Sequence, residues 1–103
     1  MQSKAYGQLC PMARALDALG ERWTLLLIRE LLLGPKRFKD FLAILPAMAP
    51  NQLSARLSML VDSGVVQSIE LPTSAYELTL PGEQLRKPLI SLGPWGLILP
   101  VDE

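Results

Sequence analysis

The chain of 103 residues has no histidine and a single cysteine. Histidine is the most common general base and metal ligand in proteins, so its absence argues against Ser-His or Cys-His catalysis and against a zinc site. A lone cysteine, Cys10, leaves no partner for a disulfide within the chain. A domain of this size also has too little interior to enclose a deep cofactor cleft. We therefore expect no enzymatic activity, no metal and no cofactor.

Charge is scarce and balanced, with ten Lys and Arg against ten Asp and Glu and a formal net charge of zero. This balance argues against indiscriminate binding to nucleic acid, which grows with the number of phosphates neutralised. No uninterrupted apolar run approaches the ~20 residues that span a bilayer. Residues 1–7 carry a single charge and no apolar segment typical of a signal peptide. We expect a cytoplasmic, soluble protein without membrane contact, folded as a single domain over residues 1–103.

Apolar residues at helical spacing predict four helices in the first two thirds of the chain. The predicted segments are residues 10–20, 23–33, 37–43 and 51–64. Proline is favoured in the first turn of a helix, which marks Pro11 as a start, and Gly20 is a plausible stop. The second segment is apolar nearly all round, which is typical of a helix covered on most sides.

A β-hairpin pattern follows the last two of these helices, with strands expected at residues 65–71 and 76–80 and a turn at 72–74. Thr79 is expected to cap one final helix that runs through Leu92, and Gly93-Pro94 is expected to interrupt it. The order predicts a mainly helical α+β fold, a winged helix-turn-helix with five helices and one β-hairpin wing. Such a helix pair presents one helix to a groove of DNA.

The fourth predicted helix has two different faces. Leu53, Leu57 and Leu60 fall on one face at intervals of three and four residues. The opposite face is small and polar near its start, which suits the major groove, roughly 12 Å wide, better than a protein core. We expect base contacts from three residues, namely Asn51, Gln52 and Ala55, whose alternative is an ordinary exposed helix face.

Basic residues gather where the third predicted helix begins. Lys36, Arg37 and Lys39 lie at a helix N-terminus, a place where backbone phosphates are often held, although such a cluster can equally be a solvated turn. Arg56 lies at the border of the two faces of the fourth helix and is a further phosphate candidate. Its alternative is an ion pair with Asp62 or a neighbouring carboxylate. We thus predict phosphate binding by Lys36, Arg37, Lys39 and Arg56.

Cys10 stands at the start of the first predicted helix, with Arg14 one turn further on. A helix N-terminus and a nearby cation both favour thiolate over thiol, the condition for reactivity at neutral pH. A redox-sensing role is therefore one hypothesis for Cys10. The alternative is a small buried apolar residue, since free cysteine is often that.

Several motifs together resemble the HxlR-type winged-helix transcriptional regulators of bacteria and archaea. They are Cys10-Pro11, 22–31 (RWTLLLIREL), 34–38 (GPKRF), 53–57 (LSARL) with 64–66 (GVV), and 76–79 (YELT) with Gly82. Members of that family are homodimers that pair through the first and last helices and bind operator DNA. The resemblance implies the same for this chain, with the fourth helix as recognition helix. In some members a cysteine at the place of Cys10 senses oxidants or electrophiles.

The C-terminal segment, residues 88–101, has no charged side chain. Such an apolar surface on a small domain implies a partner, and the first helix of a second subunit is the economical choice. Residues 88–103 are thus predicted to be a dimerisation segment, unless they lead into a further domain. The expected interface residues are Met12, Leu16, Leu89, Leu92 and Trp95.

These observations predict a sequence-specific transcriptional regulator that binds double-stranded DNA as a homodimer on a pseudo-palindromic operator. The alternative is a winged-helix module that dimerises or docks to proteins without touching DNA, which the zero net charge and the wing without Lys or Arg favour. Salt-dependent DNA binding would separate the two.

Overall fold

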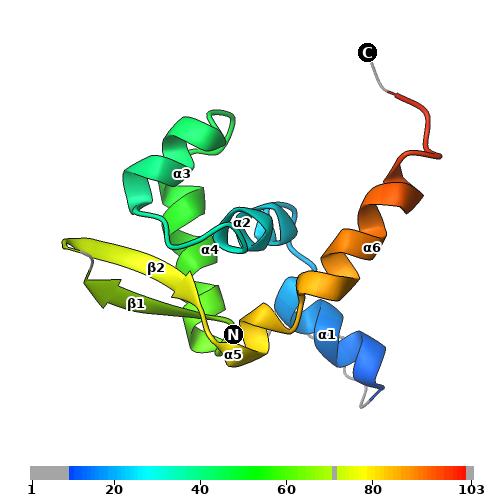
Figure 1. The fold of residues 1–103 in the computed structure, drawn as a ribbon, viewed down its shortest axis with the longest axis horizontal. Helices are drawn as coiled ribbons and strands as arrows, with labels where there is room; N and C mark the ends of the chain where they lie inside the picture. Colours follow the sequence, from blue (N-terminus) through cyan, green and yellow to red (C-terminus); the bar gives the residue numbers. More distant parts are fainter. Residues whose placement is uncertain (1–9, 71, 102–103) are drawn as a thin grey trace.

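The computed structural model describes residues 10–70 and 72–101. In this part of the chain it contains six helices and one antiparallel hairpin (Figure 1). The elements are α1 (Pro11–Leu19), α2 (Thr24–Leu31), α3 (Phe38–Ile44), α4 (Pro50–Asp62), β1 (Val66–Glu70), β2 (Ser74–Leu78), α5 (Leu80–Glu83) and α6 (Arg86–Gly96). The winged helix-turn-helix predicted from the sequence is confirmed. The N-terminal segment 1–7 and Leu71, which also carried predictions, lie outside the described residues.

Helices α2, α3 and α4 enclose the hydrophobic core with the base of the hairpin. Its fully buried side chains include Leu27 and Ile28 from α2, Phe41 from α3 and Leu53 and Leu57 from α4. The predicted apolar stripe of the fourth helix is confirmed, and the apolar second helix is the central core helix. Burial of an aliphatic or aromatic side chain contributes about 1.5–3 kcal/mol each, so this cluster holds α4 firmly by one face.

Both ends of α4 are closed by local hydrogen bonds. Pro50 occupies the first turn, and the backbone N–H of Ala49 donates to Oε1 of Gln52 at 3.0 Å. At the other end, Gly64 adopts a φ of +81°, a left-handed conformation that favours glycine. Its N–H donates to the Val61 carbonyl, and the Val65 N–H donates to the Leu60 carbonyl, at 3.1 and 3.0 Å. This is the Schellman arrangement, and it turns the chain directly into β1.

The wing is the β1–β2 hairpin, in which Val66 pairs with Leu78 and Glu70 with Ser74. The returning strand was expected at 76–80, but it begins at Ser74 and ends at Leu78, so Ser74 belongs to the strand rather than to the turn. The segment before α3 also joins this sheet. Lys36 and Tyr76 exchange two backbone hydrogen bonds, at 3.0 and 2.8 Å, which the sequence did not reveal.

The expectation of one final helix from Thr79 through Leu92 is wrong, as is the resulting total of five. The chain forms a short α5, bends at Gln84 and Leu85, and continues as α6. The Leu85 N–H donates to the Gly82 carbonyl, a tighter turn than an α-helix makes, and the bend leaves Leu85 and Leu89 packed on the core. Thr79 does cap α5, since its Oγ1 accepts the Gly82 N–H at 3.2 Å.

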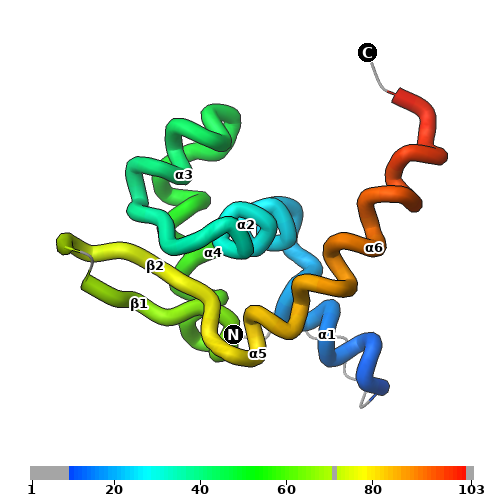
Figure 2. The backbone as a smooth tube through the Cα atoms, viewed as in Figure 1, coloured from blue at the N-terminus to red at the C-terminus, as the bar shows by residue number. Residues whose placement is uncertain are grey.

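Gly93 and Pro94 do not interrupt α6, contrary to expectation, because the helix continues to Gly96. Pro94 lacks an N–H, but this part of α6 is exposed, so the carbonyl left without a helical donor can bind water. Figure 2 shows α6 leaving the helix-turn-helix core on the side opposite the wing. No helix within residues 10–70 and 72–101 combines the length and apolar character needed to cross a membrane.

Candidate nucleic-acid interface

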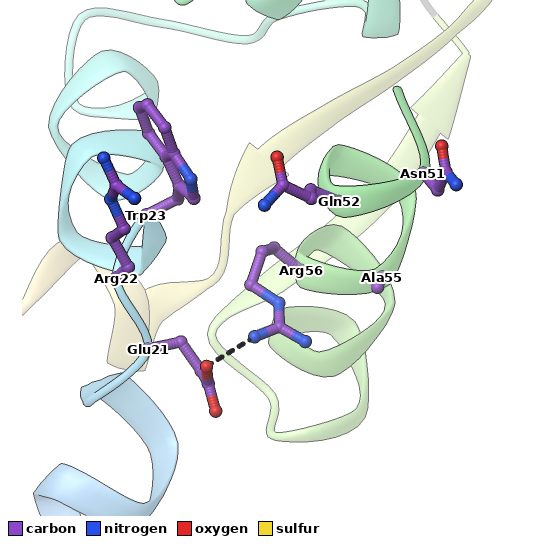
Figure 3. Close-up of a pocket in the computed structure, with 7 residues that line it drawn as sticks. All are labelled: Glu21, Arg22, Trp23, Asn51, Gln52, Ala55 and Arg56. Carbon is purple, nitrogen blue, oxygen red and sulfur yellow. Dashed lines mark ion pairs between the residues drawn. The ribbon is translucent and has the colours of Figure 1, made fainter. Parts of the chain in front are cut away.

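Helix α4 exposes the residues predicted to read bases. Asn51, Gln52 and Ala55 are all exposed in its first two turns. Their side chains do not point the same way, however. Figure 3 shows Asn51 and Ala55 on one side of α4, whereas Gln52 extends toward Trp23 near the start of α2. The open surface of α4 is therefore divided between a side that faces away from the protein and a side that borders α2.

The amide of Gln52 has a defined orientation. Its Oε1 accepts the Ala49 N–H at 3.0 Å, and its NH2 group remains as a donor. Bidentate reading of adenine requires a glutamine to accept through oxygen and donate through nitrogen at the same time. Gln52 is thus set up chiefly to donate to an acceptor on a ligand.

Arg56 forms an ion pair with Glu21, a carboxylate that the sequence analysis did not name. Its Nη1 lies 2.8 Å from Oε1 of Glu21, in the link between α1 and α2, rather than near Asp62. The two side chains are 21% and 20% exposed, so the pair is partly desolvated. The ion pair fastens the middle of α4 to the start of α2 (Figure 3).

The basic cluster lies around the N-terminus of α3. Asp40 Oδ2 accepts the Arg37 backbone N–H at 2.8 Å and so caps the helix. Lys39 is exposed, whereas Lys36 and Arg37 are partly buried. The Lys36 ammonium donates to the Gly34 carbonyl at 3.2 Å and therefore lies against the end of α2.

Three residues of the α1–α2 link, Glu21, Arg22 and Trp23, form one wall of a cavity of about 340 Å³. The other wall is α4, which contributes the base-reading candidates and Arg56. The Arg22 guanidinium lies 5.2 Å from the centre of the Trp23 ring. The Trp23 indole N–H is buried and has no hydrogen-bond partner among the described residues. Sequence reasoning missed this site because Trp23 was interpreted as the start of a core helix, and Arg22 lies just before it.

Cys10 is exposed at the N-cap of α1, and its carbonyl accepts the Arg14 N–H at 3.0 Å. The alternative that Cys10 is a buried apolar residue is therefore wrong for the single chain. Two predicted interface residues of α1, Met12 and Leu16, are exposed as well, the former to 67%.

Helix α6 has no buried residue, although it carries many apolar side chains. Leu92 and Trp95 are exposed, the latter to 58%, whereas Leu89 is partly buried against the core. Further large apolar side chains stand exposed at Ile90, Leu97, Ile98, Leu99 and Val101. The predicted interface residues thus lie on two helices whose large apolar side chains are mostly exposed in the single chain.

Residues 18–99 match the model of the HxlR-like helix-turn-helix family, a match that includes every element from α2 to α6. The chain belongs to this family. HxlR-type proteins are transcriptional regulators with a DNA-binding winged helix, and not enzymes, so the family resemblance found in the sequence is confirmed.

Curated relatives are about one third identical to this HxlR-type chain over the aligned residues. It is 37% identical over 89 residues to an uncharacterized HTH-type transcriptional regulator of Mycobacterium tuberculosis, covering 82% of this chain and 56% of the relative. The chain thus spans little more than half the length of that relative. It is 34% identical over 93 residues to the HTH-type transcriptional regulator YodB of Bacillus subtilis, covering 85% of this chain and 83% of YodB.

Two solved structures of regulators show the same fold. The redox regulator HypR in its oxidized form has a TM-score of 0.81 at 28% identity, covering 90% of this chain and all of that one (100%). Quinone-bound YodB from B. subtilis has a TM-score of 0.77 at 33% identity, covering 88% of this chain and 100% of that one. The first is thus a redox regulator in an oxidized form, and the second is a regulator bound to a quinone.

Proposed function

We propose that this HxlR-type chain is a sequence-specific DNA-binding regulator of transcription and that α4 is its recognition helix. The observation that carries the proposal is the division of α4. One face is fully buried through Leu53, Leu57 and Leu60, and the other exposes Asn51 and Ala55. A helix fixed by one face and open on the other is what insertion into a major groove requires.

The same proposal includes a homodimer formed through α1 and α6. Exposed Met12 and Leu16 on one helix and Leu92 and Trp95 on the other provide an apolar surface that a second copy would cover. A two-fold dimer repeats the same surface on both subunits and places two recognition helices on successive major grooves, about 34 Å apart. The operator of such a dimer would be pseudo-palindromic.

The test is fluorescence anisotropy with a labelled duplex from upstream of the chain's own gene and with a scrambled duplex of equal length. Each titration is repeated at several salt concentrations. We expect tighter binding to the native duplex, with a logarithmic affinity that falls linearly with the logarithm of salt. Equal and weak binding to both duplexes would refute sequence-specific regulation.

We further propose that Cys10 senses oxidants or electrophiles. It is exposed, it stands at the N-cap of α1, and it precedes Met12 of the proposed interface by two positions. A diamide-type oxidant would take two electrons and two protons from two Cys10 thiols and join the protomers, whereas a quinone would add to the thiolate sulfur. Mass spectrometry at low reagent excess should show a linked dimer or an adduct, and an unmodified thiol would refute this role.

A second function is a winged-helix module that dimerises or docks to proteins without binding DNA. Its support is specific: Arg56 is paired with Glu21, the Lys36 ammonium lies on a backbone carbonyl, and residues 66–78 contain no Lys or Arg. The anisotropy titrations separate the two functions, because this module would show no salt-dependent preference for any duplex.

A further inference from the structure

The cavity between the α1–α2 link and α4 contains polar groups whose presence base reading alone does not explain. Its walls come from two parts of the chain more than twenty residues apart, Glu21–Trp23 and the first turns of α4. The Glu21–Arg56 ion pair closes one end, and the Gln52 side chain extends toward Trp23 across it (Figure 3). The fold thus fixes the shape of this cavity, whose α4 wall includes Asn51 and Ala55.

Three groups at this cavity can donate hydrogen bonds to a ligand. The buried Trp23 N–H has no acceptor among the described residues, and the Gln52 side chain, whose oxygen accepts the Ala49 N–H, carries an NH2 group that can donate. Exposed Arg22 adds a positive charge beside the Trp23 ring and makes no ion pair within the described part of the chain. The carboxylate at the site, Glu21, is occupied by Arg56. Such a set of donors with one cation fits an oxyanion.

The position of the cavity indicates which oxyanion. An α-helix with its side chains is about 10–12 Å across and the major groove is about 12 Å wide, so a helix in the groove has a phosphate backbone along each flank. The cavity lies along one flank of α4, next to the residues that would meet base edges. The basic residues Lys36, Arg37 and Lys39 lie around the start of α3 and do not line this cavity, so a phosphate bound there would be a separate contact.

We propose that this cavity binds a backbone phosphate of DNA through Arg22, the Gln52 amide and the Trp23 indole N–H. The inference rests on the proposed DNA-binding function and adds a phosphate contact on the flank of the recognition helix that borders α2. The indole N–H is buried in the free protein. Its use as a donor therefore requires the side chains around it to move when DNA binds.

The first experiment compares DNA affinity and its salt dependence between Arg22→Ala and Lys87→Ala. Lys87 is an exposed cation in the first turn of α6, so its removal changes net charge equally but away from α4. We expect Arg22→Ala to weaken binding about tenfold and to reduce the slope of log affinity against log salt by about 0.9, the value for one neutralised phosphate. Lys87→Ala should leave the slope unchanged.

The second experiment observes the indole N–H directly by ¹H–¹⁵N NMR. The chain has two tryptophans, and Trp95→Phe assigns the remaining indole signal to Trp23. Addition of duplex DNA should move the Trp23 indole proton downfield, as a new hydrogen bond to a phosphate oxygen does. Trp23→Phe keeps an aromatic ring but removes the donor, so it should lower affinity while leaving the salt slope unchanged.

The outcomes separate this proposal from the regulator function. If the protein binds DNA with a salt-dependent preference while Arg22→Ala keeps the slope and the Trp23 signal does not move, the phosphate site is refuted and the regulator stands. If the protein binds no duplex, both fail together. Salicylate serves as a small carboxylate probe, and a Trp23 signal that responds to salicylate and not to DNA would overturn the phosphate proposal.

Discussion

Replacement of Glu21 by glutamine tests whether Arg56 is available to DNA. Glu21→Gln keeps the size of the side chain but removes the charge that holds Arg56 at 2.8 Å. Arg56 would then be free to turn toward a phosphate, and a negative charge beside α4 would be gone. Both changes favour DNA, so we expect Glu21→Gln to bind duplex more tightly and Arg56→Ala to bind it more weakly.

The magnitude follows from the exposure of the pair and from the number of phosphates that Arg56 can neutralise. One additional neutralised phosphate steepens the salt slope by about 0.9, which is roughly a three- to four-fold greater change in affinity between 50 and 200 mM salt. Exposed ion pairs contribute about 0–1 kcal/mol, and breaking a fully buried pair costs about 3–5 kcal/mol. With side chains 21% and 20% exposed, a coupling of about 1 kcal/mol is expected for Arg56 and Glu21.

A double-mutant cycle measures that coupling by urea denaturation of the two single variants, the double variant and the parent protein. Anisotropy titrations on the same four proteins give the DNA affinities. Glu83→Gln is the matched control, because Glu83 pairs with Arg86 at 2.9 Å away from α4 and should leave DNA affinity unchanged. The reasoning is refuted if Glu21→Gln weakens binding, since Glu21 would then hold Arg56 in the orientation that DNA requires.

Three further predictions concern packing, assembly and the basic cluster. A Cβ at Gly82 would collide with the Val65 carbonyl oxygen, so Gly82→Ala should lower the free energy of unfolding by about 1–3 kcal/mol. Gly93→Ala, where no atom lies within 4 Å of a new Cβ, should raise it by about 0.5–1 kcal/mol at the same protein concentration; equal urea midpoints would contradict this. Trp95→Ser should shift sedimentation from dimer toward monomer because it removes an exposed apolar side chain of α6, and an unchanged dimer would place the interface elsewhere. Alanine at both Lys36 and Arg37 should weaken binding to all duplexes alike and reduce the salt slope by about 1 for each phosphate that is no longer neutralised, whereas an undiminished slope would exclude them as phosphate ligands.

The helix-turn-helix and the wing were predictable from the sequence because their signals are local. Leu53, Leu57 and Leu60 recur at helical spacing, and burial of that stripe is sufficient to fix the orientation of α4. The end of α4 is equally local, since the Gly64 N–H donates three positions back, to Val61, and the Val65 N–H donates five positions back, to Leu60. Thr79 was recognisable as a cap because a hydroxyl before a helical pattern is a strong N-cap signal.

The remaining features depend on contacts between residues distant in the sequence. The Glu21–Arg56 ion pair joins residues 35 positions apart, and no periodicity indicates which carboxylate an arginine will meet. The pairing of Lys36 with Tyr76 is likewise visible only in the folded chain. The helix pattern from Thr79 to Leu92 ran on without a break because both α5 and α6 are helical, and the bend between them comes from the packing of Leu85 against the core.

The hydroxyl of Thr79 has a mechanical consequence. It donates to the Gly64 carbonyl at 2.5 Å, just beyond the end of α4, and accepts the Gly82 N–H at the start of α5. One oxygen atom therefore joins the end of the proposed recognition helix to the segment that leads into α6. If two copies pair through α6 as proposed, this hydrogen-bonded link makes α4 move together with α6. A small rotation between the protomers would then change the separation of the two recognition helices, with no need for either chain to deform.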